Sequence, residues 1–130
     1  MSYKAQLTTL LLLSTQFTHT NATDAPRGQD IYRAHCVGCH SMRCNKLGPR
    51  LDGLFGREAG SLPDFTDFSP ELKASGIVWS ETTLDTFLRD PGKMVPGTKM
   101  TVSVRLSNAS DRSDVIAYLR SANTSLDLCF

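Results

Sequence analysis

The chain has 130 residues, of which 40% are hydrophobic, and its 14 basic and 13 acidic side chains give a formal net charge of +1. This length allows one domain with room for a removable leader. A near-neutral chain without a basic tract argues against nucleic-acid binding, and beyond the N-terminal region no apolar run is long enough for a membrane span.

Residues 1–22 have the anatomy of a secretory signal peptide. Lys4 gives a basic start, residues 5–13 form a short apolar core, and small and polar residues continue to Ala22. The core is about half as long as a bilayer crossing requires. We therefore expect cleavage after Ala22, a mature domain over residues 23–130, and export to the periplasm or an equivalent compartment. The alternative interpretations are an uncleaved anchor and an ordinary helix.

The rest of the chain predicts an all-α domain, with a few helices joined by long loops. A capping side chain followed by proline marks two helix starts, at Asp24-Ala25-Pro26 and at Ser69-Pro70. Apolar residues at helical spacing mark two further helices. In chain order, the predicted helices cover residues 26–35, a short segment from Pro70 that Gly76 stops, residues 81–89, and the segment from about Ser110 onward.

Two loops are unusually long for a small domain. Residues 46–67 are rich in Gly, Pro and Asp, and residues 91–108 carry the Pro96-Gly97 turn signal. Loops of this length are uncommon in a compact domain. They are reasonable if they wrap a large cofactor.

The segment Cys36-Val37-Gly38-Cys39-His40 matches the pattern for covalent haem attachment. Its two thiols would reach one porphyrin edge, and His40 would lie beneath the iron as the proximal ligand. Zinc binding with Cys44 is an alternative, although zinc sites usually take ligand pairs from separate segments. Thiol–disulfide exchange would need a strand–helix context, and a simple disulfide leaves His40 unexplained.

The second axial ligand has few candidates. His35, the other histidine of the mature chain, lies on the same turn as the attachment motif and cannot reach the opposite haem face. Met42 is too close to the motif in sequence. Met94 and Met100 both lie in the proline-rich loop, where a chain can fold over a flat cofactor, and the sequence alone favours Met100 only slightly.

Several further segments, in one order, resemble the class I cytochromes c of mitochondria and bacteria: residues 48–51, 53–57, 76–79, 83–88, 96–100 and 114–119. The resemblance spans residues 28–121. It implies the cytochrome c fold around one covalent haem c, and a soluble monohaem electron carrier that shuttles single electrons between redox partners and is not an enzyme. The alternatives are a haem subunit of a larger oxidoreductase and a peroxidase-type enzyme.

The resemblance also implies individual roles. Met100 matches the distal sulfur ligand, so the iron ligands would be His40 and Met100, a pair that raises the reduction potential. Pro49 matches the residue whose carbonyl accepts a hydrogen bond from the proximal histidine. In the helices, Gly28 and Tyr32 match the face that crosses the C-terminal helix.

Three further residues match groups around the haem propionates. Trp79 and Thr98 match hydrogen-bond donors to these carboxylates, and Arg57 matches a buried guanidinium that offsets their charge. Phe68 and Phe87 depart from the family because tyrosines often stand at these positions. The cofactor-binding residues are therefore expected to be Cys36, Cys39, Pro49, Arg57, Trp79 and Thr98.

The expected partners are redox proteins that dock at an exposed haem edge. Lysines are sparse in the mature chain, so long-range electrostatic steering should be modest. We expect a monomer that binds no nucleic acid and is not stably inserted in a membrane after leader cleavage. The lysines are Lys46, Lys73, Lys93 and Lys99.

Cys44 and Cys129 lie outside the attachment motif. In an exported protein, two remaining cysteines most simply pair with each other. The bridge would close a loop of 85 residues, for which the chain-entropy model gives about 4.5 kcal/mol of stabilisation. The alternatives are two free thiols or an intermolecular link.

Overall fold

The structure, a computed structural model, describes residues 22–100, 106–122 and 129. Residues 1–21 of the predicted leader lie outside this range. The described chain is all-α, as expected, and its only strand-like pairing is an antiparallel bridge between Glu58 and Val78. None of its helices is long and apolar enough to cross a bilayer. The helices are α1 (Ala25–His35), α2 (Pro70–Lys73), α3 (Glu81–Arg89), α4 (Pro91–Met94) and α5 (Ala109–Ser121).

Helix starts follow the capping signals in the sequence. The side chain of Asp24 accepts a hydrogen bond from the backbone of Arg27 at the start of α1. At α3, Ser80 and Thr83 form a reciprocal capping box, in which each side chain bonds to the other residue's backbone. The predicted bounds of α3 are confirmed.

The expectation that residues 91–108 form a loop is wrong for the first residues of that range. The segment over residues 91–108 begins with a single helical turn, α4, because Asp90 accepts a hydrogen bond from the backbone of Lys93 at 3.1 Å and Pro91 supplies the helical φ angle. Asp90 and Pro91 directly follow the helix predicted over residues 81–89 and mark its end. The same two residues also begin a new one, since a proline that cannot continue a helix is favourable in the first turn of another.

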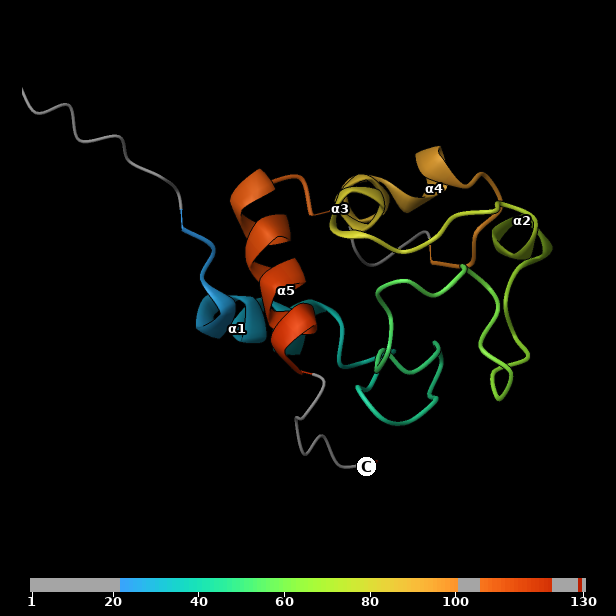
Figure 1. The fold of residues 1–130 in the computed structure, drawn as a ribbon, viewed down its shortest axis with the longest axis horizontal. Helices are drawn as coiled ribbons and strands as arrows, with labels where there is room; N and C mark the ends of the chain where they lie inside the picture. Colours follow the sequence, from blue (N-terminus) through green and yellow to red (C-terminus); the bar gives the residue numbers. More distant parts are fainter. Residues whose placement is uncertain (1–21, 101–105, 123–128, 130) are drawn as a thin grey trace, which may run out of the picture.

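Helices α1 and α5 cross at close range, and α3 packs against α5 from another side (Figure 1). Gly28 is the contact point in α1, because a side chain there would overlap the backbone carbonyl of Asp114. One turn further, the rings of Tyr32 and Tyr118 have centroids 5.3 Å apart. The expected crossing of the two helices is confirmed.

Ion pairs and hydrogen bonds of buried charged residues hold α1, α3 and α5 together. Asp114 of α5 accepts a hydrogen bond from the backbone of Asp24 at 2.8 Å and pairs with Arg27 of α1. Arg112, which is 4% exposed, donates to Asp85 of α3 at 2.7 Å and to the carbonyl of Leu106, also at 2.7 Å. Each buried charge is therefore paired, as a low-dielectric interior requires.

Hydrogen bonds between distant loop segments order the chain where it has no helix. The backbone of Gly56 donates to Trp79 at 2.8 Å, Trp79 donates to Arg57 at 3.0 Å, and Ala59 donates to Ile77 at 2.7 Å. These bonds place residues 56–59 beside residues 77–79. The loops over residues 41–69 and the helical layer of α3 and α4 thus face each other across the molecule (Figure 1).

Replacing Gly28 with Ala is expected to destabilise the protein by about 1–3 kcal/mol or more, because the added methyl group overlaps the backbone of α5. Gly38→Ala is the matched control, since a methyl group there meets nothing within 4 Å. Denaturant unfolding of the two variants measures the difference. Equal stability of both variants would contradict the close crossing.

The Asp114 carboxylate makes stability depend on acid pH. Its hydrogen bond from the backbone of Asp24, and then that from Arg27, hold the pKa of Asp114 below its ordinary value of 3.8. The folded state therefore favours the charged form, so the stabilisation is present above pH 3.8 and is lost as the pH falls through the lowered pKa.

Asp114→Asn is expected to lower the free energy of unfolding by about 1.5–3 kcal/mol at neutral pH, the range for hydrogen bonds to a charged group. The difference from the unmodified protein should shrink as the pH falls below 3.8. Asp30→Asn is the control, because Asp30 is 79% exposed in its ion pair with Arg33. A pH-independent effect of Asp114→Asn would contradict this account.

Candidate functional site

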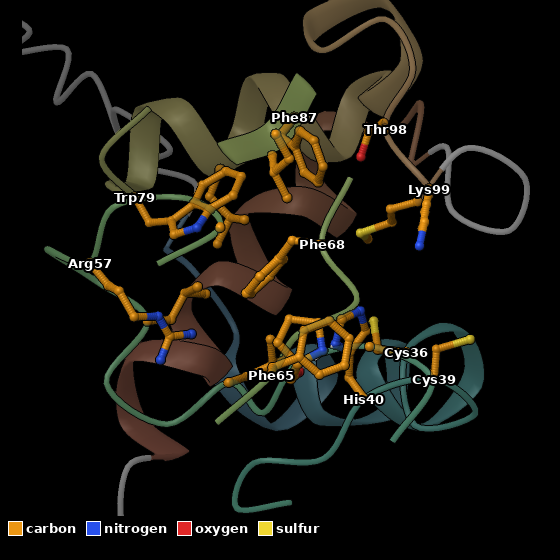
Figure 2. A pocket seen from close by; sticks show the side chains of 18 of the residues that line it. Cys36, Cys39, His40, Arg57, Phe65, Phe68, Trp79, Phe87, Thr98 and Lys99 are labelled. Atoms are coloured by element: carbon orange, nitrogen blue, oxygen red, sulfur yellow. Dashed lines mark hydrogen bonds between the residues drawn. The ribbon is translucent and has the colours of Figure 1, made fainter. Parts of the chain in front are cut away.

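The structure brings all eight predicted site residues to one cavity. The cavity lies between the loops after α1 and the layer of α3 and α4, and most of its wall is apolar. Figure 2 shows Cys36, Cys39 and His40 on one side, with Trp79 and Thr98 on the opposite side. The predicted residues in its lining are Cys36, Cys39, His40, Pro49, Arg57, Trp79, Thr98 and Met100.

The imidazole of His40 is oriented by the loop that follows it. Its Nδ1 lies 2.8 Å from the carbonyl oxygen of Pro49. A carbonyl only accepts hydrogen bonds, so Nδ1 carries the proton and Nε2 keeps its lone pair for a metal. Burial lowers the pKa of His40, although the bond to Pro49 opposes that shift. The ring is thus held neutral, as iron ligation requires.

Gly48 allows this approach of the loop. A side chain at position 48 would overlap the His40 ring, with its Cβ only 2.8 Å from Nδ1. The backbone of Gly48 also donates to the carbonyl of Cys39 at 2.8 Å. The loop therefore closes directly over the attachment motif.

The attachment cysteines lie on one turn that continues from α1. The backbones of Cys39 and His40 both donate to the carbonyl of Cys36, at 3.0 and 2.8 Å. The two thiols are free and are not joined to each other. Burial raises the pKa of the Cys36 thiol to about 11, so it is protonated at neutral pH, which suits the addition of a thiol across a vinyl group.

The opposite wall comes from α3 and from the chain after α4. Trp79 packs edge-on against Phe87, with ring centroids 5.0 Å apart. Thr98 is 3% exposed and donates its backbone N–H to Val95 at 3.0 Å. Met100 lines the cavity, whereas Met94 does not. The tertiary structure thus separates two methionines that the sequence barely distinguishes.

Arg57 reaches the cavity from its side (Figure 2). Its guanidinium donates to the carbonyl oxygens of Asp52 at 2.9 Å and Arg50 at 3.1 Å. Burial lowers the pKa of Arg57, yet arginine stays charged at any physiological pH. A positive charge fixed by carbonyls at the cavity wall suits a carboxylate of the bound group.

The apolar part of the lining fits a flat, largely apolar cofactor. Phe65 and Phe68 contact each other edge-on, with centroids 4.8 Å apart, and both line the cavity with Leu51 and Leu72. A haem offers the matching chemistry, since it has apolar faces, vinyl groups for thiols, an iron for nitrogen and sulfur, and carboxylates for a guanidinium. The residues present therefore fit this group.

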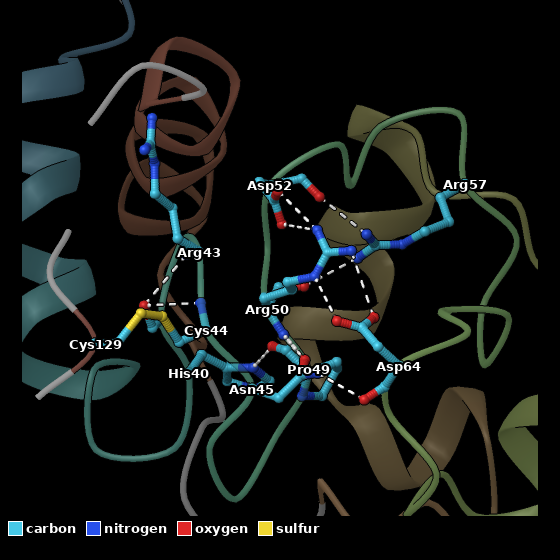
Figure 3. Close-up of polar contacts among 11 residues, drawn as sticks. His40, Arg43, Cys44, Asn45, Pro49, Arg50, Asp52, Arg57, Asp64 and Cys129 are labelled. Atoms are coloured by element: carbon cyan, nitrogen blue, oxygen red, sulfur yellow. Dashed lines mark hydrogen bonds and ion pairs between the residues drawn. A yellow bond between two sulfur atoms is a disulfide. The ribbon is translucent and has the colours of Figure 1, made fainter. Parts of the chain in front are cut away.

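Cys44 is paired with Cys129, with their Cα atoms 5.6 Å apart (Figure 3). That spacing lies within the range of disulfides. The pairing also removes Cys44 from the four-residue set considered for zinc. Within residues 22–100, 106–122 and 129, no three His, Cys, Asp or Glu side chains are grouped to hold a metal ion.

Sequence reasoning missed a polar network behind His40. Asn45, Arg50 and Asp64 bond to one another across the loops (Figure 3). Asp64 lies 14 residues from Arg50 and 19 from Asn45 in irregular chain, so neither periodicity nor spacing indicated the contacts.

Comparisons with known proteins identify the family of the chain. The sequence profile of the family "Cytochrome c" matches residues 25–123. Cytochrome c of Stellaria longipes is 40% identical over 100 residues, covering 75% of this chain and 91% of that protein. Cytochrome c2 of Blastochloris viridis is 37% identical over 117 residues, covering 88% of this chain and 90% of that protein.

A solved structure gives the same result for the fold. Cytochrome cH from Methylobacterium extorquens superposes with a TM-score of 0.70 at 40% identity, covering 75% of this chain and 98% of that chain. The chain therefore belongs to the cytochrome c family, whose members carry single electrons on a covalently bound haem c.

Proposed function

We propose that this chain is a freely diffusing, exported electron carrier whose single haem is closed to substrates by His40 and Met100. The observation that carries the proposal is that these two residues, together with both attachment cysteines, line one cavity although they come from segments 60 residues apart. When bound, the haem iron accepts and releases one electron. The protein's part is to hold that iron in one coordination state.

Each site residue has a stated task in this proposal. Cys36 and Cys39 form the thioethers, and Pro49 keeps the His40 ring in the tautomer that presents Nε2 to the iron. Met100 would supply a sulfur ligand to the iron. On the cavity walls, Arg57, Trp79 and Thr98 hold the propionates, and the Arg57 charge favours the carboxylate form of these groups.

The proposal excludes enzymatic chemistry at the iron. With His40 and Met100 both bound to the iron, peroxide or another substrate would find no open coordination site. The described part of the cavity wall also places no second histidine opposite His40 that could serve as a catalytic base. A peroxidase-type enzyme would instead bind cyanide or carbon monoxide readily at neutral pH without denaturant.

Ligation by Met100 is tested by exchanging each loop methionine in turn. Met100→Ala is expected to abolish the weak red absorption band that a methionine–iron bond gives ferric haem, and to open the iron to cyanide. Met94→Ala is the matched control, because Met94 is the last residue of α4 and lies outside the cavity lining, and should keep the band. If only Met94→Ala lost the band, the ligand would be Met94 and not Met100.

We infer export to the periplasm from the predicted leader over residues 1–22, and the relatives from Blastochloris viridis and Methylobacterium extorquens are bacterial proteins. Partner proteins would dock at the haem edge. The mature chain is formally neutral, and Lys99 is paired with Asp67, so salt should affect docking only modestly. A dedicated haem subunit would instead co-purify with a larger enzyme and migrate at its size.

In an exported protein, the Cys44–Cys129 pair is proposed to be a disulfide. In the haem-loaded protein, alkylation without prior reduction should add no mass, and alkylation after reduction should label two cysteines. Cys129→Ser is the control and should expose one thiol for labelling without reduction. The variant should also lose up to about 4.5 kcal/mol of stability, given the 85-residue loop. Labelling of two cysteines without reduction would contradict the bridge.

A further inference from the structure

The loop over residues 45–50, here called the proximal loop, is closed by one side chain. The Oδ1 atom of Asn45 accepts a hydrogen bond from the backbone N–H of Arg50 at 2.9 Å. Its Nδ2 atom donates to the backbone carbonyl of Asp64 at 2.8 Å. A single carboxamide thus joins the two ends of the proximal loop and attaches them to a segment 19 residues away (Figure 3).

Arg50 attaches the loop to the same segment a second time. Its guanidinium lies 3.2 Å from one carboxylate oxygen of Asp64 and 2.6 Å from a carboxylate oxygen of Asp52. The hydrogen bond from Arg50 is the main cause that lowers the pKa of Asp64. Exposed ion pairs contribute little by themselves, so the half-buried carboxamide of Asn45 is the stronger of the two attachments.

Two carbonyls inside this closed loop face the functional side chains. The carbonyl of Pro49 accepts the Nδ1–H of His40 at 2.8 Å, and the adjacent carbonyl of Arg50 accepts from the guanidinium of Arg57 at 3.1 Å. Asn45 bonds to the backbone N–H between these two carbonyls. Its bond therefore orients the Pro49–Arg50 peptide unit, whose carbonyl bonds to His40, and fixes the residue whose own carbonyl bonds to Arg57.

We propose that Asn45, supported by Arg50 and Asp64, is a positioning residue that sets how strongly His40 donates electrons to the iron. The inference rests on the proposed function, in which His40 is an iron ligand. A short bond from Nδ1–H to a carbonyl makes the imidazole a stronger donor, and a stronger donor favours the ferric state. Releasing the proximal loop would weaken that bond and raise the reduction potential.

Asn45→Ala is the test, because it removes both hydrogen bonds without changing the charge near the haem. Asn108→Ala is the matched control: Asn108 also accepts from a backbone N–H, that of Ser110 at 2.8 Å, but it caps α5 and is not part of the cavity wall. Both variants should lose stability. Only Asn45→Ala should raise the reduction potential measured by spectroelectrochemistry.

A second readout follows the His40 proton directly. In the reduced, diamagnetic protein, the Nδ1–H proton of His40 should exchange with solvent about tenfold faster in Asn45→Ala, the change expected for the loss of one ordinary hydrogen bond. Asn108→Ala should leave that rate unchanged. An unchanged potential together with an unchanged exchange rate in Asn45→Ala would overturn the inference.

A second pair of variants, both of which preserve charge, tests the inference if the Asn45→Ala protein does not bind haem. Arg50→Lys retains the positive charge but replaces the planar fork that reaches Asp52 and Asp64 together. Arg89→Lys is its control, since Arg89 pairs with Asp85 at 2.9 Å, away from the cavity wall. A raised potential in Arg50→Lys alone supports the inference, and equal potentials oppose it.

The outcomes separate this inference from the proposed function. The unmodified protein should first show covalent haem and the red band of methionine ligation. If it does, and the potentials of the variants are unchanged, only the positioning role fails. If the unmodified protein lacks haem or lacks the band, the proposed function fails and the positioning role fails with it.

Discussion

The hydrogen bond from Nδ1 of His40 to the carbonyl of Pro49 constrains the chain on both sides of it. The bond selects the tautomer in which Nε2 is free, and it requires the backbone to pass so close to the ring that only glycine fits at position 48. That approach draws the whole proximal loop over the attachment motif. Asn45 then ties the loop to the next one, and Arg57 uses the neighbouring carbonyl of Arg50. His40, Asn45 and Arg57 thus all bond to one short backbone segment, residues 49–50.

The helices provide a rigid base for this arrangement. Because α1 and α5 cross at Gly28, the turn that carries the cysteines leaves α1 from a fixed point. The buried pairs of Asp114 with Arg27 and of Arg112 with Asp85 hold α1, α3 and α5 in one orientation. The contacts that fix the positions of the cavity-lining elements therefore lie outside the cavity. This separation explains how a small domain with long loops can keep His40 and Met100, which are 60 residues apart, at one cavity.

Fixed ligation is what electron transfer requires of such a site. An iron that keeps the same two ligands in both oxidation states needs little rearrangement when an electron arrives. The wall is mostly apolar, and the Arg57 guanidinium contributes a positive charge at one side of the cavity. The loops contribute to this function through hydrogen bonds between backbone groups, such as those that join residues 56–59 to residues 77–79.

Local sequence patterns account for the features that neighbouring residues create. The attachment motif at residues 36–40, the capped starts of α1 and α3, and the all-α class follow from local patterns, because cap and turn chemistry acts over a few residues. Asp90-Pro91 shows the limit, since the pattern allows both an end and a beginning. The tertiary structure was needed to show that Met100 and not Met94 lines the cavity with His40, that Cys44 meets Cys129, and that Asn45 reaches Asp64. Those contacts join residues 19 to 85 positions apart in chain that is largely irregular, where no periodicity relates one partner to the other and only the folded chain brings them within bonding distance.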